Sequence, residues 1–214
     1  MATTTTPSRQ DLLRRGQRLE YFTIGYNSAE GLISIIAGLV AGSVSLIGFG
    51  LDSVIEVASG TALLWRLHQD HHRSRREQVE RITLRIVGGC FLALAVYILY
   101  KSGSTLIGHE APERSIPGIL VAGAAVIVMP LLARAKRRVA AGIGSGAMSA
   151  DSKQADFCTY LSAILLGGLL LNTLFGWWWA DPGAGLVMVP IIAKEGIDGI
   201  RGKACCDDCG AAHY

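Results

Sequence analysis

Two acidic residues stand four positions apart inside an apolar stretch of the chain. Asp52 and Glu56 belong to the run Leu51-Asp52-Ser53-Val54-Ile55-Glu56, and in a helix such residues share one face. Two like charges on one face of a low-dielectric segment repel each other unless a cation lies between them. Since carboxylate oxygens bind divalent cations, the pair predicts a metal site. The alternative is a protonated carboxyl group hydrogen-bonded to neighbouring Ser or Asn side chains.

A second polar pair with the same spacing follows later in the chain. Gln154 and Cys158 could face Asp52 and Glu56 across a helix pair and complete a set of four protein ligands. Cysteine sulfur combined with carboxylate oxygen suits Zn²⁺ or a similar borderline-soft divalent ion. The alternatives are that Cys158 is a small buried core residue and that Gln154 forms an interhelical hydrogen bond.

Further acidic and amide residues near these pairs are candidates for accessory metal ligands. Asn27 and Glu30 share one face of the first apolar segment, where Glu30 either lines an ion pathway or pairs with a basic residue at the rim. Asp151 either caps a helix or assists the site, and Asp156 could line its entrance. Asp181 follows three Trp residues and is expected to cap a helix.

Cysteine and histidine residues also gather outside the apolar segments. Five cysteines make a poor disulfide framework and favour thiol or metal chemistry in a reducing compartment. Four tail residues could enclose Zn²⁺ tetrahedrally, namely Cys205, Cys206, Cys209 and His213; an inert or redox-sensitive tail is the alternative. The loop with His68, Asp70, His71 and His72 either collects metal or is a solvated basic loop.

The composition is that of a membrane protein. Of 214 residues, 50% are hydrophobic, 17% are charged and 26 are Gly, with a mean hydropathy of +0.39. These values exclude a disordered chain, a disulfide-rich secreted module and a typical cytosolic enzyme. A helix crosses a bilayer with about 20 apolar residues, and six such runs predict an all-α, six-helix transmembrane bundle: 20–41, 43–65, 83–107, 116–133, 157–177 and 180–199.

Charge predicts the orientation of this bundle. Of the 20 Lys and Arg residues, all but Lys101 and Arg114 flank the same side, and the positive-inside rule places that side and both termini in the cytoplasm. We expect a cytoplasmic segment 1–19 without a signal peptide, the membrane domain 20–199, and a Cys-rich cytoplasmic tail 200–214 too short for a core. The clustered charge argues against a nucleic-acid partner.

Several stretches resemble the cation diffusion facilitator family. The similarity runs from Gly42-Ser43-Val44-Ser45-Leu46 through Asp52 and Glu56, resumes at Ala150-Asp151-Ser152-Lys153-Gln154, and ends at Trp179-Ala180-Asp181-Pro182. The resemblance implies a homodimeric transporter that exports divalent metal ions, mostly zinc, from the cytoplasm, usually in exchange for protons. It also implies that the two spaced pairs, in the second and fifth helices, are the transport ligands.

The chain departs from the family pattern in its fifth-helix pair and in its C-terminal part. A His and an Asp four apart are typical of the fifth helix, where this chain has Gln154 and Cys158. Proton coupling would then fall on Asp52, Glu56 or Cys158, or be weak. The family's cytoplasmic C-terminal domain is not expected here, so the tail could partly replace it and dimerisation would rest on membrane helices, through faces such as Gly167-Gly168.

The favoured function is zinc efflux by proton-coupled alternating access in a bacterial inner membrane. The sequence has no Gly-rich phosphate loop and no paired nucleophile and base, so we expect neither an enzyme nor a bound cofactor. One alternative is a metal-binding membrane sensor or regulator that does not transport. Another is a transporter for Fe²⁺, Mn²⁺ or Co²⁺.

Overall fold

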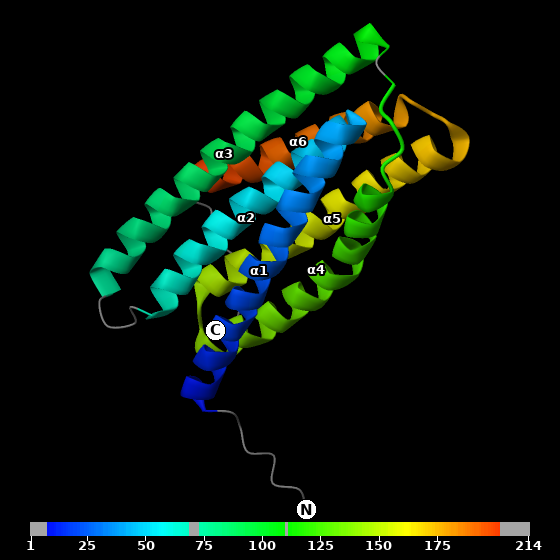
Figure 1. Ribbon diagram of the computed structural model, residues 1–214. Helices are drawn as coiled ribbons and strands as arrows, with labels where there is room; N and C mark the ends of the chain where they lie inside the picture. The colour runs from blue at the N-terminus through cyan, green and yellow to red at the C-terminus, as the bar shows by residue number, and fades with distance from the viewer. Residues whose placement is uncertain (1–7, 69–72, 110, 202–214) are drawn as a thin grey trace, which may run out of the picture.

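The computed structural model describes residues 8–68, 73–109 and 111–201, and they form six helices (Figure 1). The predicted tail ligands Cys205, Cys206, Cys209 and His213 lie outside the described residues, as do Asp70, His71 and His72. The helices are α1 (Arg9–Ala41), α2 (Val44–His68), α3 (Arg73–Gly108), α4 (Ile116–Ile143), α5 (Gly146–Phe175) and α6 (Ala180–Ile200). The described residues contain no strand, so the predicted all-α class is confirmed.

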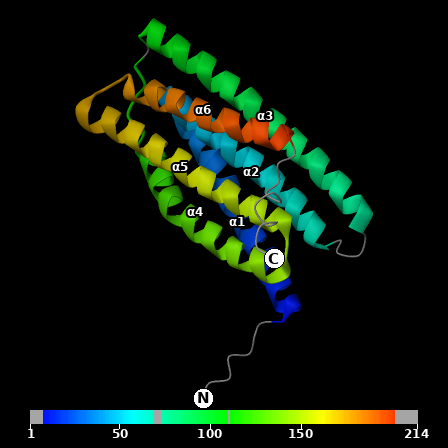
Figure 2. The ribbon, with the colours of Figure 1, turned by 180° about the vertical axis from the view of Figure 1, so that it is seen from behind.

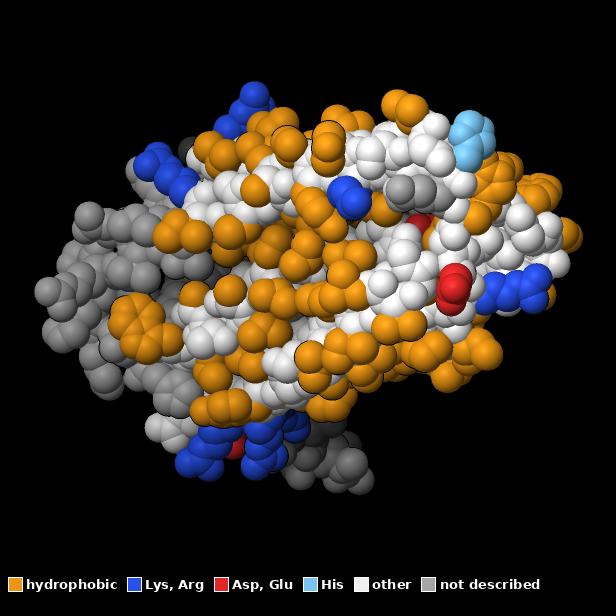
Figure 3. All heavy atoms as spheres, turned by 45° about the horizontal axis from the view of Figure 1, so that its top comes forward, with side chains coloured by type: hydrophobic (Ala, Val, Ile, Leu, Met, Phe, Trp, Pro, Cys, Tyr) orange, Lys and Arg blue, Asp and Glu red, His pale blue; other side chains and the backbone are white. Residues whose placement is uncertain are grey.

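Five of the helices are long and apolar enough to cross a membrane. The candidate spans are Arg9–Ala41, Val44–Trp65, Arg85–Gly108, Ile116–Ile143 and Met148–Phe175. Helix α6 is formed as predicted, but Lys194, Glu195 and Asp198 bring charge into its C-terminal third. Hydrophobic side chains are spread widely over the face drawn in Figure 3, and outward residues such as Val40 and Ile107 are 76% and 83% exposed. The chain is therefore a multi-pass membrane protein.

The helices extend beyond the apolar runs from which they were predicted. Helix α1 begins at Arg9 rather than near residue 20, behind a capping box in which Ser8 and Asp11 exchange hydrogen bonds. Helices α4 and α5 continue through the charged stretch 134–156 and meet at Gly144, whose φ of 63° reverses the chain. Polar residues at a membrane surface end the apolar run without ending the helix.

The bundle has two parts. Helices α1, α2, α4 and α5 form a four-helix body, in which α1 packs on α2 and α4, and α4 packs on α5. Helices α3 and α6 form a pair that lies against α2 and α5 (Figures 1 and 2). Successive helices run in opposite directions, so α1 begins at the same end at which α4 and α5 meet. We call this end, which holds Arg9 and Gly144, the basic end.

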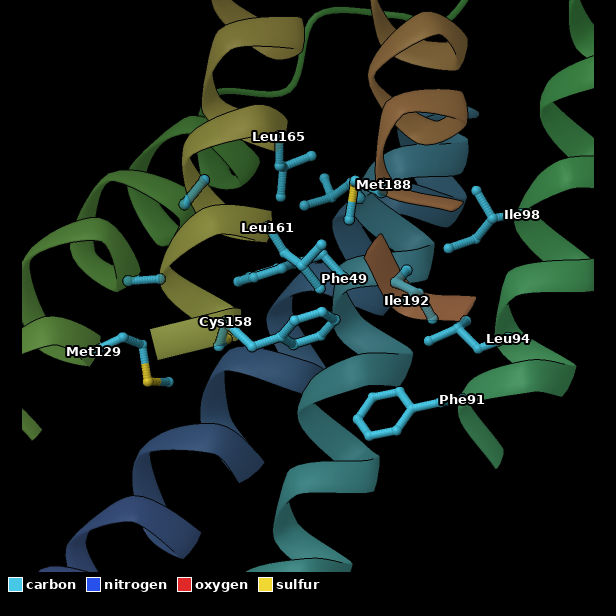
Figure 4. Close-up of a cluster of buried hydrophobic side chains, with 14 of the residues drawn as sticks. Phe49, Phe91, Leu94, Ile98, Met129, Cys158, Leu161, Leu165, Met188 and Ile192 are labelled. Carbon is cyan, nitrogen blue, oxygen red and sulfur yellow. The ribbon is translucent and has the colours of Figure 1, made fainter. Parts of the chain in front are cut away.

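An apolar core joins the two parts. It includes Phe49 of α2, Ile98 of α3, Leu161 of α5 and Met188 of α6 (Figure 4). Cys158 belongs to the same cluster and is fully buried. The groups described next are therefore set in surroundings that exclude water.

Candidate metal site

Asp52, Glu56 and Cys158 lie together in the centre of the four-helix body. One carboxylate oxygen of each acid and the Cys158 sulfur all lie within 4.8 Å of one another. Asp52 and Glu56 stand one turn apart on α2, and Cys158 reaches them from α5. Asp52 and Cys158 are fully buried and Glu56 is 6% exposed. We call these three residues the carboxylate–thiol cluster.

The Asp52 carboxylate has the Cys158 thiol as its polar neighbour and accepts no hydrogen bond from an N–H or O–H group of the described residues. Both of its oxygens are buried without a hydrogen-bond partner among the described residues. Buried polar groups almost always have a partner, and an unpaired buried charge is costly. Two acids and a thiol that converge in this way form a donor set of oxygen and sulfur suited to a borderline-soft divalent cation.

Helix α1 adds polar side chains to the edge of this cluster. Asn27 is fully buried and donates from Nδ2 to Oε2 of Glu56 at 2.5 Å. Glu30, one turn further along α1, accepts from the Ser53 hydroxyl at 2.8 Å. Its other oxygen, Oε2, and Asn27 Oδ1 are buried without hydrogen-bond partners among the described residues. The structure thus brings Asn27 against a candidate ligand and pairs Glu30 with a hydroxyl group.

Gln154 lies one turn from Cys158 on α5, toward the basic end. Its Oε1 accepts a hydrogen bond from the Ser59 hydroxyl of α2 at 3.1 Å. Its Nε2 is buried and has no hydrogen-bond partner among the described residues. An amide oxygen has two lone pairs, so this interhelical contact leaves one acceptor position on Gln154.

Two of the predicted accessory acids form ion pairs. Asp156 is 29% exposed and pairs with Arg137 of α4, with Arg137 NH1 2.6 Å from Asp156 Oδ2. Asp151 does not cap α5, because Ser145 is the N-cap residue of that helix. Its Oδ2 instead makes a short contact with the Lys136 ammonium group. Ion pairing rather than capping therefore accounts for the position of Asp151.

Asp181 caps a helix other than its own. It is fully buried in α6, and its carboxylate accepts from the Ser43 hydroxyl at 2.6 Å, from the Val44 backbone N–H at 3.0 Å, and from the Ser45 hydroxyl. The free N–H groups at the start of α2 are thereby satisfied from a distant helix. The motifs Gly42–Leu46 and Trp179–Pro182 meet at this contact.

The buried cation Lys136 was not among the residues predicted from the sequence. It lies in a run of basic residues near Arg137, but its side chain is only 1% exposed. Its Nζ lies 3.2 Å from Oε1 of the fully buried Glu20 of α1 and contacts Asp151 of α5. We call Glu20, Lys136 and Asp151 the lysine triad. Helical periodicity could have predicted that Lys136 is buried, because it falls on the inward face of α4. The buried positions of that helix include Met129, Leu132, Ala133, Lys136, Val139 and Ala140.

Comparison with known proteins points to transport. Residues 23–202 match the family model described as the cation efflux transmembrane domain. The chain is 24% identical over 172 residues to a protein named Cation-efflux pump FieF from Shewanella oneidensis. The aligned residues are 78% of this chain and 58% of that protein.

Two further relatives carry the name of uncharacterized transporters. The one from Methanocaldococcus jannaschii is 27% identical over 178 residues, or 80% of this chain and 62% of that protein. The one from Synechocystis sp. is 25% identical over 168 residues, or 75% of this chain and 54% of that protein. The chain thus matches less than two thirds of the length of each of these three relatives.

Proposed function

Because this chain belongs to the cation efflux family, we propose that it carries divalent cations across a cell membrane through the carboxylate–thiol cluster. The family predicted from the sequence is confirmed by this match. The observation that supports the proposed site is the convergence of Asp52, Glu56 and Cys158 within 4.8 Å, combined with the absence of a hydrogen-bond partner for Asp52 among the described residues.

Charge balance favours a divalent guest at this cluster. Two carboxylates in buried surroundings repel each other, and a cation of charge +2 compensates both. Among the described residues, none of the ion pairs given above joins Asp52 or Glu56 to a Lys or Arg side chain. Gln154 and water would complete the coordination, with Asn27 holding Glu56 in place from α1.

The thiol of Cys158 favours zinc over harder ions. Thiolate is a soft ligand that selects Zn²⁺ and related ions, whereas Mg²⁺, Ca²⁺ and Mn²⁺ prefer sites made of oxygen alone. Ligands must be deprotonated to bind a metal, so binding releases protons and protonation favours release. We propose that Asp52, Glu56 and Cys158 couple metal movement to proton movement in this way, as a metal–proton antiporter.

The proposed transport cycle alternates access between the two ends of the bundle. The basic end would face the cytoplasm, because it gathers the Lys and Arg residues, and the cation would bind from there and leave at the other end. A homodimer would assemble through the membrane helices. In this conformation the cluster is closed to solvent on both sides, since its three residues are at most 6% exposed.

The test is metal flux into proteoliposomes under an imposed pH gradient. The purified chain is compared with Asp52→Asn, Glu56→Gln and Cys158→Ser, with Glu113→Gln, an exposed acid at the opposite end, as the matched control. We expect Zn²⁺ flux for the wild type and the control and its loss in Asp52→Asn. Normal flux in Asp52→Asn would refute the site. Zn²⁺ binding without flux by the wild type would indicate the non-transporting sensor.

A further inference from the structure

The lysine triad lies in register with the carboxylate–thiol cluster on two helices. Glu20 and Asn27 are seven positions apart on α1, and Asp151 and Cys158 are seven positions apart on α5. Seven residues are close to two helical turns, so each pair shares a face and is separated by roughly 10 Å along the helix. The triad therefore lies about two helical turns from the cluster, toward the basic end, on the same inner faces of α1 and α5. We call the line of polar side chains formed by the triad and the cluster the polar column.

Gly60 of α2 allows the Glu20 side chain to pack close to the α2 backbone. Gly60 follows Glu56 by one turn, and a Cβ atom placed on Gly60 would lie 3.3 Å from Oε2 of Glu20. The Glu20 carboxylate thus lies against the backbone of α2, where a larger side chain would separate it from the column. Helices α1, α2, α4 and α5 all contribute to this level of the bundle.

The triad contains more acidic than basic groups. Glu20 and Asp151 supply two carboxyl groups, and Lys136 supplies the one ammonium group that contacts both. Glu20 is fully buried, and both of its oxygens lie near the Lys136 ammonium group, Oε1 at 3.2 Å and Oε2 at 3.3 Å. Removing one partner from a buried ionic group is strongly destabilising, so without Lys136 these two acids would need another cation or a proton between them.

We propose that Glu20 and Asp151 form a second divalent-cation position on the transport path, and that Lys136 occupies it as a tethered cation in this conformation. The inference rests on the proposed function, because the path is the one that leads to the carboxylate–thiol cluster. Lys136 blocks the column between the basic end and the cluster. A divalent ion that enters from this end exchanges with the Lys136 ammonium group, and Lys136 returns once the ion has moved on.

Helix α4 contains a feature that permits this exchange. Pro130 lies inside the helix, six positions before Lys136. Proline cannot donate the helical hydrogen bond to the carbonyl four residues earlier, and it commonly kinks a helix. Pro130 therefore removes one backbone hydrogen bond from α4 and marks a position at which this helix can bend.

The experiment counts Mn²⁺ ions bound to the full-length purified chain. Mn²⁺ is chosen because the second position offers only oxygen ligands, whereas thiols bind Mn²⁺ poorly. All variants carry Asp52→Asn, which removes the proposed primary site. We expect Asp52→Asn/Lys136→Met to bind about one more Mn²⁺ per chain than Asp52→Asn alone, because methionine is unbranched like lysine, is shorter by one atom and carries no charge. Lys136→Arg in the same background, which keeps a cation in place, should bind no additional ion.

A third variant locates the additional ion. Asp52→Asn/Lys136→Met/Asp151→Asn leaves one carboxylate and should lose the additional Mn²⁺. No additional ion in Asp52→Asn/Lys136→Met would refute the inference, as would an additional ion that survives Asp151→Asn.

Thermal unfolding covers the case in which the loss of Lys136 impairs folding. Mn²⁺ should then raise the Tm of Asp52→Asn/Lys136→Met but not that of the triple variant. A chain that remains unfolded at every Mn²⁺ concentration would refute the inference. Flux through Asp52→Asn tests the proposed function separately: normal flux refutes the primary site, whereas lost flux without an additional ion refutes only the second position.

Discussion

The side-chain amide of Asn27 in α1 donates a hydrogen bond of 2.5 Å to Oε2 of Glu56 in α2. This contact makes α1 part of the candidate metal site, although all three members of the carboxylate–thiol cluster belong to α2 and α5. By engaging one oxygen of Glu56, Asn27 fixes the direction in which the carboxylate presents the other.

Replacing Asn27 by leucine should weaken metal binding without removing any proposed ligand. We expect the Kd for Zn²⁺ to rise by about 10-fold, the range seen when partners that orient metal ligands are lost. Ser28→Ala is the matched control, because Ser28 is exposed and bonds only to the Ile24 carbonyl of its own helix. Equal Kd values for Asn27→Leu and the wild type would contradict the positioning role.

The sulfur of Cys158 should determine which ions the cluster prefers. In Cys158→Ser we expect Zn²⁺ affinity to fall by more than the roughly 10-fold effect of losing an orienting partner. Mn²⁺ affinity should change little, because a hydroxyl group suits a hard ion better than a thiol does. Binding is measured for both ions on the same preparations. A parallel loss for both ions would show that Cys158 is a packing residue.

Asp181 should contribute strongly to stability. Asp181→Ala removes the cap of α2 and leaves the Ser43 and Ser45 hydroxyls buried without their acceptor. Losing a cap costs about 1 kcal/mol and each of the two unsatisfied buried hydroxyls costs about 1–3 kcal/mol, so we expect a loss of at least about 3 kcal/mol in unfolding free energy. Asp181→Asn retains one acceptor oxygen and should lose less. Thermal unfolding in detergent measures both variants.

The α3–α6 pair depends on direct contact between two glycines. A Cβ atom on Gly88 would lie 2.7 Å from the Gly196 carbonyl oxygen, and overpacking of this kind costs about 1–3 kcal/mol. We therefore expect Gly88→Ala to lower the Tm. Gly89→Ala is the neighbouring control, since nothing lies within 4 Å of its added Cβ. An equal Tm for the two variants would contradict close packing of this pair.

The predicted orientation can be tested with reporter fusions. We expect a fusion truncated after Gly144 to report from the cytoplasm and one truncated after Glu113 from the opposite side, because the basic end holds most of the Lys and Arg residues. Alkaline phosphatase, active outside the cytoplasm, and a green fluorescent protein, fluorescent inside it, give reciprocal readouts. The reverse pattern would overturn the assigned direction of transport.

Local spacing made part of the site predictable from the sequence. Asp52 and Glu56 on one helix, and Cys158 on another, stand out because charge and sulfur interrupt apolar runs at helical spacing. The number of helices follows from the length of those runs. Neither inference requires knowledge of which helices are neighbours.

The remaining contacts depend on which helices lie side by side. Lys136 was hidden in a basic run, and only the packing of α4 against α1 and α5 reveals that Glu20 and Asp151 surround it. Asp181 was expected to cap a helix, but the capped helix is α2, from a distant part of the chain. Helix ends were also missed, because hydropathy measures immersion in lipid rather than backbone hydrogen bonding.

The apolar core around Cys158 has a consequence for hydration. Leu161 and Phe49 belong to the same water-excluding cluster (Figure 4), so an ion that reaches the thiol must give up most of its shell of water molecules. Mg²⁺ loses water reluctantly and needs near-ideal octahedral geometry. We therefore expect the abundant cellular Mg²⁺ to be rejected on the way in, by the energy of dehydration as much as by the identity of the ligands.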